Sequence, residues 1–201
     1  VGALFMALDH RVRLGAISAG GAGAAITLLD LQLPEFDVRT AVSLALGVDE
    51  TVESFDLEHP IINAVIQPLL DVADPLHAAR RIYRTPGAAG PASVIMTEGF
   101  EDPLTPPRSI ETLGSVIGLP IAEPVGREVE GLVLQGIDSI ALPAHGNLES
   151  DEGDAATGAL LQYPEGGHYL IYQSRKARRQ IFDFMSTGLV DGRPEVVPPP
   201  E

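Results

Sequence analysis

Cysteine is absent from this chain of 201 residues. The chain therefore has no disulfide bond, no thiolate metal site and no cysteine nucleophile. The absence of cysteine does not fix the compartment, and we expect an exported or cell-envelope location rather than a cytoplasmic one. Basic residues are also scarce, because 13 Lys and Arg face 28 Asp and Glu, giving a formal net charge of −15. A charge of this sign repels a phosphate backbone, so we expect no nucleic-acid partner.

Long apolar runs are missing as well. No stretch approaches the roughly 18 to 20 apolar residues that a membrane-spanning helix needs, so we expect no membrane span. The N-terminal residues also lack the basic region, apolar core and cleavage site of a signal peptide. The pattern of residues 2–9 is nevertheless that of an apolar helix without a preceding cap or an initiator Met, so we expect that a further segment precedes it.

The residues that the chain does contain indicate a folded α/β protein. Hydrophobic residues make up 45% of it, and the chain is long enough to bury a sizeable core. Residues 92–97 have the pattern of a buried strand that stops at Gly99, and a Pro-rich turn leads into a helix from about Arg108. The other predicted strands are 12–18 and 158–163, with a candidate strand at 132–142. The other predicted helices are 2–9, 24–31 (helical or irregular), 175–185 and three short ones near 37–47, 60–72 and 76–83.

Alternating strands and helices favour a mainly parallel sheet with flanking helices. We assign 1–33 and 91–188 to this core, with an insertion at about 119–156. Residues 34–90 form a helical insertion, and 189–201 form a Pro-rich tail that we expect to be poorly ordered. Only about three sheet strands are visible, and a parallel sheet needs neighbours at its edges. We therefore expect the strand at 12–18 to pair with strands that this chain does not contain.

Two residues carry the functional prediction. Asp102 lies in the turn after one predicted strand, and His168 lies in the turn after another, preceded by Gly166 and Gly167. The carboxyl ends of parallel strands meet at one sheet edge, so the pair can form an acid–histidine dyad in which His168 is the general base. Each residue also has a structural alternative to its catalytic role. Asp102 can be a plain turn or cap residue, and His168 can be a core histidine.

Two further carboxylates, Glu98 and Glu101, are alternative candidates for the acid. The other histidines lack metal-ligand spacing, so we expect neither a metal nor a cofactor.

The motifs around these residues resemble the C-terminal portion of an α/β-hydrolase. They are the acid turn G-F-E-D-P-L-T-P-P (99–107), the histidine turn G-G-H-Y-L-I-Y (166–172) and the closing helix K-A-R-R-Q-I-F-D-F-M (176–185). Their order agrees with the family order of Ser, then acid, then His. The resemblance implies a serine hydrolase acting on small carboxylic esters, with 34–90 in the place of the family's cap, roofing an apolar acyl pocket.

The nucleophile is the departure from this family pattern, because no G-x-S-x-G and no upstream oxyanion loop occur in the chain. If residues 2–9 are the helix after the nucleophile elbow, the serine lies before Val1, and this chain alone is inactive. Alternatively, Ser18 in Ala16-Ile17-Ser18-Ala19-Gly20 is a variant elbow. A third interpretation is a hydrolase-like chain without activity, serving as a binding or structural subunit.

Overall fold

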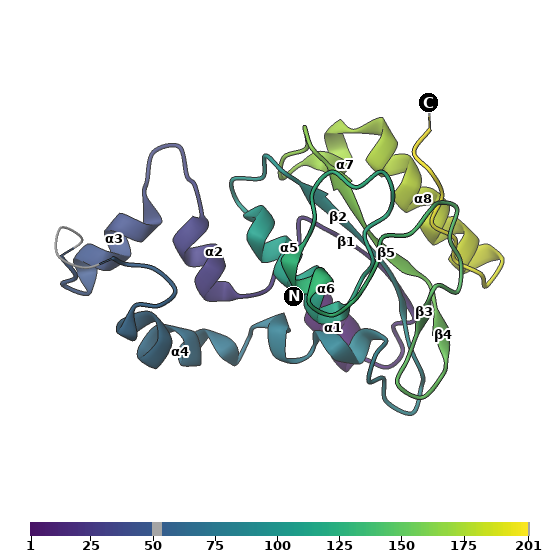
Figure 1. Ribbon diagram of the computed structural model, residues 1–201, viewed down its shortest axis with the longest axis horizontal. Coiled ribbons are helices and arrows are strands. Elements are labelled where there is room, and N and C mark those ends of the chain that lie inside the picture. The colour runs from purple at the N-terminus through teal and green to yellow at the C-terminus, as the bar shows by residue number, and fades with distance from the viewer. Residues whose placement is uncertain (50–53, 201) are drawn as a thin grey trace.

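The computed structural model of the chain describes residues 1–49 and 54–200, and its centre is a three-stranded parallel sheet (Figure 1). The strands are β1 (Leu14–Ser18), β2 (Ser93–Gly99) and β5 (Gly158–Tyr163), in the order β1-β2-β5. Helices flank this sheet, so the predicted α/β class and all three predicted core strands are confirmed. No helix in the described ranges is long and apolar enough to cross a membrane.

The sheet is covered on both faces. Along β2, Val94 and Met96 point into a core that includes side chains of α1 (Gly2–Leu8), α5 (Pro107–Ile117) and the short 3-10 helix Ala79–Ile82. The intervening Ile95 packs on the opposite face with Phe184 of α8 (Arg175–Val190). This alternation gives a central strand with no exposed apolar side, as expected for a buried parallel strand.

Helix α5 begins directly after the acid turn because of its local sequence. Pro107 occupies the first helical position, where its missing N–H costs no hydrogen bond. Ile110, Leu113 and Ile117 repeat at helical spacing and are fully buried against the sheet. The helix ends at Gly118, whose φ of 85° is the left-handed conformation that glycine adopts without steric cost.

The region between β1 and β2 is helical, as predicted, but its helices are shorter than the sequence pattern indicates. It contains α2 (Ala24–Asp30), α3 (Val38–Ala45), a π-helical turn (Ile62–Ile66), α4 (Gln67–Asp71) and two 3-10 turns, Pro75–His77 and Ala79–Ile82. Part of it has a small core of its own, built on Ala25, Leu29, Phe55 and Ile62. In Figure 1, α2, α3 and α4 project to the side of the sheet.

The segment between α5 and β5 differs from the prediction. The candidate strand at 132–142 is wrong, because this stretch starts with the end of the short helix α6 (Glu130–Val133) and then turns at Gly136, where φ is 67°. Within this described stretch, only Ile140 forms a bridge, an isolated parallel one with Ala122. A small antiparallel pair forms instead from β3 (Leu148–Glu149) and β4 (Ala155–Ala156). Residues 120–122 run beside β5, where Pro120 O accepts from Leu160 N and Ala122 N donates to Leu160 O.

The C-terminal part is more ordered than we expect from its composition. Helix α8 continues to Val190, and the chain then turns back so that Val196 is fully buried and exchanges backbone hydrogen bonds with Ala144. Gln180 also donates to the carbonyl of Val197 at 2.7 Å. The expectation of a poorly ordered tail is therefore wrong for the described residues up to 200.

Candidate active site

The acid turn holds Asp102 at the carboxyl end of β2, and its side chain is only 1% exposed. One carboxylate oxygen, Oδ1, accepts backbone N–H bonds from Leu104 at 2.9 Å and Thr105 at 2.8 Å. These bonds close the turn before α5 and fix the orientation of the carboxylate. This is the Asx-type turn that the structural alternative for Asp102 predicts, but the side chain also has a third partner.

That partner is His168, which lies between β5 and the short helix α7 (Leu170–Gln173). Its Nδ1 is 3.1 Å from Oδ2 and 3.2 Å from Oδ1 of Asp102. A buried carboxylate facing Nδ1 favours the neutral tautomer that carries its proton there. The structure thus brings together the two predicted residues, and the arrangement is the one in which an aspartate orients an imidazole. Their catalytic role stays a prediction.

The acid and histidine turns approach each other at two glycines. A Cβ on Gly99 would lie 2.4 Å from the carbonyl oxygen of Gly166, which is closer than any side chain can approach. That same carbonyl accepts the N–H of Glu101 at 2.9 Å, so a backbone hydrogen bond joins the two turns. Gly167 is less constrained, because its nearest neighbour to a Cβ would be Glu101 O at 3.5 Å. Gly99 is therefore the position whose missing side chain lets the acid turn approach the backbone of Gly166 in the histidine turn.

The second ring nitrogen of His168 is available for a further contact. The side chain is 29% exposed, and in the described part of the chain no group hydrogen-bonds to Nε2. The ring of Tyr169 stands edge-on to the imidazole, with 5.1 Å between centroids. The imidazole is thus held on one side by Asp102 and presents Nε2 away from it, as a general base requires.

Ser18 does not meet His168. It ends β1, pairs in register with Thr97, and its Oγ accepts a hydrogen bond from Thr97 Oγ1 at 2.9 Å. Since β2 separates β1 from β5, strand spacing alone places Ser18 about 10 Å from β5. The positive φ in this turn, 50°, falls on Ala19 rather than on Ser18.

The alternative acids are placed elsewhere. Glu101 is exposed on the surface of the turn, and its backbone is what contacts the histidine turn. Glu98 is fully buried within β2, where Arg127 and Gln162 hydrogen-bond to its carboxylate. Neither carboxylate is bonded to His168, so Asp102 is the one among the three candidate acids that contacts it.

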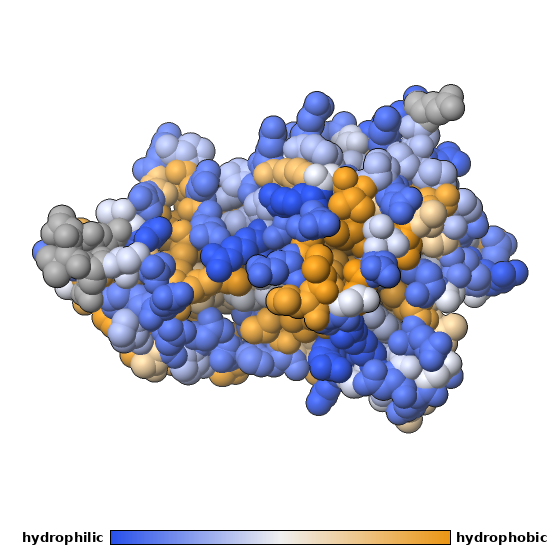
Figure 2. Space-filling model, in the orientation of Figure 1, coloured by the Kyte–Doolittle hydropathy of each residue, from blue (hydrophilic) through white to orange (hydrophobic). Residues whose placement is uncertain are grey.

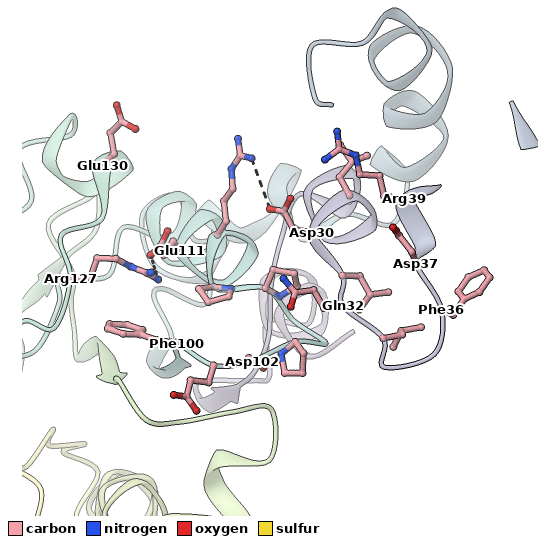
Figure 3. Close-up of a pocket in the computed structure, with 18 of the residues that line it drawn as sticks. Asp30, Gln32, Phe36, Asp37, Arg39, Phe100, Asp102, Glu111, Arg127 and Glu130 are labelled. Carbon is pink, nitrogen blue, oxygen red and sulfur yellow. Dashed lines mark ion pairs between the residues drawn. The ribbon is translucent and has the colours of Figure 1, made fainter. Parts of the chain in front are cut away.

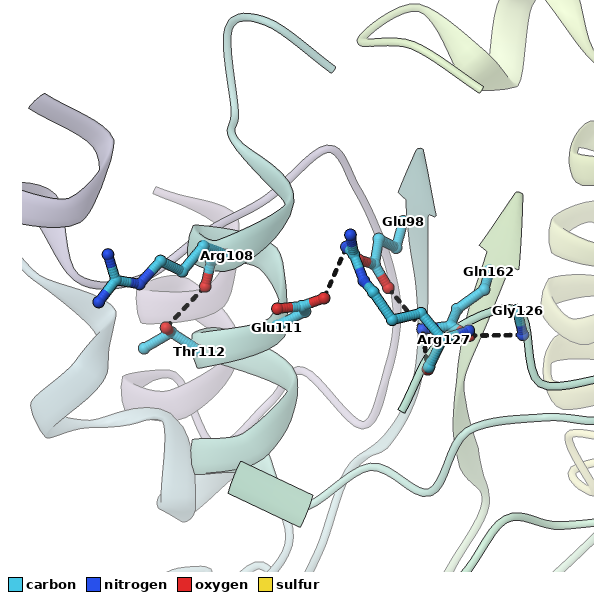
Figure 4. Close-up of polar contacts among 7 residues, drawn as sticks. All are labelled: Glu98, Arg108, Glu111, Thr112, Gly126, Arg127 and Gln162. Carbon is cyan, nitrogen blue, oxygen red and sulfur yellow. Dashed lines mark hydrogen bonds and ion pairs between the residues drawn. The ribbon is translucent and has the colours of Figure 1, made fainter. Parts of the chain in front are cut away.

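Sequence reasoning missed the polar cluster around Glu98, which lies at the same sheet edge (Figure 4). Arg127 Nη2 is 2.8 Å from Glu98 and 2.6 Å from Glu111 of α5, so one guanidinium lies between two carboxylates. Burial, reinforced by the nearby charge of Glu111, raises the pKa of Glu98 to about 7 in spite of its bonds to Gln162 and Arg127. The only sequence signal was an acidic residue inside an otherwise apolar strand.

A cavity of about 1190 Å³ adjoins the acid turn (Figure 3). It lies between the segment 29–39, the turn that carries Asp102, the start of α5 and residues 127–130, and His168 is not among its lining residues. Its lining mixes apolar side chains with charged ones, whereas the sequence resemblance implies an apolar acyl pocket. The charged members are Asp30, Asp37, Arg39, Glu101, Asp102, Arg108, Glu111, Arg127, Glu128 and Glu130.

No group of three or more potential ligands is suitably placed to hold a metal ion among the residues that the structure describes. Comparisons with models of known protein families, with curated proteins and with solved structures found no match for this chain. The geometry around Asp102 and His168 therefore carries the functional argument.

Proposed function

We propose that this chain supplies the acid and the base of a serine hydrolase of α/β-hydrolase type, acting on small carboxylic esters. The observation that carries the proposal is the contact between the buried Asp102 and Nδ1 of His168, with Nε2 left for a nucleophile. The two residues stand after adjacent parallel strands and in the order, acid then histidine, that α/β-hydrolases share.

In the proposed reaction, a serine hydroxyl attacks the ester carbonyl while Nε2 of His168 takes its proton. The imidazolium then gives that proton to the departing alkoxide, leaving an acyl-serine. Water attacks the acyl-serine with His168 again as the base, which releases the acid and restores the serine. Asp102 keeps the proton of the neutral imidazole on Nδ1 and stabilises the imidazolium.

The serine and the oxyanion donors would come from a segment that pairs with the outer edge of β1. On the other side of the sheet, residues 120–122 hydrogen-bond along the outer side of the edge strand β5. No described residue bonds to the outer side of β1, the other edge strand. Along the chain, each connection adds the new strand on the same side of the one before it, β2 beside β1 and β5 beside β2. Helices α1 and α5 pack on the same face of this sheet. Because such connections are right-handed, a parallel strand leading into α1 would lie on this open edge.

The outer face of α1 supports the same partner. Phe5 and Leu8 recur at helical spacing and are 54% and 60% exposed, whereas Ala3 and Met6 face the core. In Figure 2, apolar side chains gather on the viewed face around α6 and the N-terminal end of the chain. An apolar stripe beside an unpaired strand edge is typical of a surface that another element covers. In the same proposal, the helical segments of 34–90 take the place of the cap.

A hydrolase-like binding or structural subunit without activity is the second candidate. The observation that favours it is that no hydroxyl group in the described ranges is bonded to Nε2 of His168, with Ser18 engaged by Thr97 instead. Under both proposals, this chain alone does not hydrolyse p-nitrophenyl esters and is not labelled by a serine-directed phosphonate.

The experiment that separates the enzyme from the inactive subunit is phosphonate labelling. The chain is expressed together with the residues encoded upstream of Val1 and is then treated with the serine-directed phosphonate. The enzyme proposal predicts phosphonate labelling of a serine in the added segment. Asp102→Asn then lowers kcat by about 10⁴-fold and His168→Ala by about 10⁶-fold. His145→Ala, a histidine bonded instead to the carbonyl of Pro194, is the control and keeps its rate. Labelling at Ser18 would overturn the assignment of the nucleophile, and wild-type rates in Asp102→Asn would remove the triad.

A further inference from the structure

Arg127 joins the two elements that flank the acid turn. Its Nη2 is 2.8 Å from Glu98 at the end of β2 and 2.6 Å from Glu111 on α5. Its guanidinium also lies over the ring of Phe100, with Cζ 4.4 Å from the ring centroid. Glu98 and Glu111 precede and follow the turn, and Phe100 belongs to it, so one planar side chain contacts the strand before the acid turn, the helix after it and one residue of the turn itself.

The backbone of Arg127 is fastened to the third element, β5. The amide oxygen of Gln162 accepts the N–H groups of Gly126 and Arg127, both at 3.0 Å. The amide nitrogen donates to the carbonyl of Arg127 at 3.0 Å and to Glu98 at 2.9 Å. Gly126 is packed so closely that a Cβ there would lie 3.0 Å from Phe100. Arg127 is thus attached to β5 through its backbone and to β2 and α5 through its side chain.

These anchors stand close to the dyad in sequence. Glu98 lies four residues before Asp102, and Gln162 lies six residues before His168. A change in the spacing of β2, β5 and α5 at this edge would move the acid turn relative to the histidine turn. The dyad is sensitive to such a change, because its hydrogen bond weakens steeply with distance and angle.

We propose that Arg127 is a positioning residue, which holds the acid turn so that Asp102 faces Nδ1 of His168. This inference rests on the proposed function, in which the dyad is the acid and base of the hydrolase. Lysine cannot replace arginine here, because an ammonium lacks the planar fork that meets two carboxylates and stacks on a ring. The residue acts through the turn and does not touch the dyad.

The test is the tautomer of His168, read from the ¹⁵N shifts of the imidazole in the full chain at a pH where the ring is neutral. Wild type is expected to carry the proton on Nδ1, and Asp102→Asn is expected to lose this preference. Arg127→Met should move the tautomer population by at least half of the difference between wild type and Asp102→Asn. Arg84→Met is the matched control, because Arg84 also joins separate segments, through Tyr83 and Gln135, but near Gly118 at the far end of α5.

A wild-type tautomer in Arg127→Met would overturn the positioning role, and so would an equal change in Arg84→Met, which would mark a general loss of structure. If Arg127→Met does not fold, Glu111→Gln removes one ion pair at constant volume and should give a smaller change of the same direction. An unchanged tautomer in Glu111→Gln would then refute the proposal. If Asp102→Asn itself behaves as wild type, the dyad of the proposed function fails, and the positioning role fails with it.

Discussion

Replacing Glu98 by glutamine should make the chain less sensitive to alkaline pH. Glu98 is fully exposed to water in the unfolded chain but fully buried in β2, where Arg127 is shared with Glu111. Burial of the carboxylate raises its pKa from 4.5 to about 7 in the folded protein. Glutamine keeps the shape and can still accept a hydrogen bond from Arg127, but it does not ionise.

The sign follows from proton linkage. Because the pKa is higher in the folded state, the folded state binds this proton more tightly than the unfolded state does. The resulting stability is fully present below pH 4.5 and is lost as the pH rises through about 7. At about 1.4 kcal/mol for each pH unit between the two pKa values, the loss approaches about 3 kcal/mol. Wild type should therefore lose about this much free energy of unfolding relative to Glu98→Gln.

Urea unfolding of both proteins between about pH 5 and about pH 8 measures this difference, provided that both unfold in two states. Glu128→Gln is the control, because it removes an exposed carboxylate close to Arg127 and should leave the pH dependence unchanged. A difference between wild type and Glu98→Gln that stays flat across this range would show that the buried carboxylate is not protonated near neutrality, and the reasoning from burial would be refuted.

Two further predictions concern the turns. Gly99→Ala should lower the free energy of unfolding in urea by about 1 to 3 kcal/mol, because the added Cβ meets the backbone of Gly166. Gly167→Ala, the control, should change the free energy of unfolding by no more than about 0.5 kcal/mol. Equal effects of the two substitutions would contradict the close approach at Gly99. Asp74→Ala should cost about 3 kcal/mol, because the buried carboxylate accepts three backbone N–H groups, two of them at the start of α2. Asp37→Ala, which removes an exposed helix cap, should cost about 1 kcal/mol, and a similar cost for both would contradict this role of burial.

Local patterns were sufficient for the elements that build the sheet. Continuous apolar runs bounded by glycine or proline located β2 and β5, and the Pro-rich turn located the start of α5 to within one residue of Arg108. The same local patterns gave a wrong prediction for the stretch 132–142. Its apolar residues fit a strand as well as a helix, and the glycine at 136, which adopts a positive φ, breaks the run after one helical turn.

The sequence by itself placed Asp102 and His168 after two strands of a parallel sheet, because the side-chain pattern and turn residues of each strand are local properties. Only the tertiary structure decided that β2 and β5 are neighbours, that Gly99 and Gly166 touch, and that Nδ1 faces the carboxylate at 3.1 Å. The cluster of Arg127 with Glu98 could not be predicted, since its members are 29 residues apart and meet only when an irregular segment crosses the sheet edge. Contacts of that kind depend on how the whole chain packs, and no local pattern encodes them.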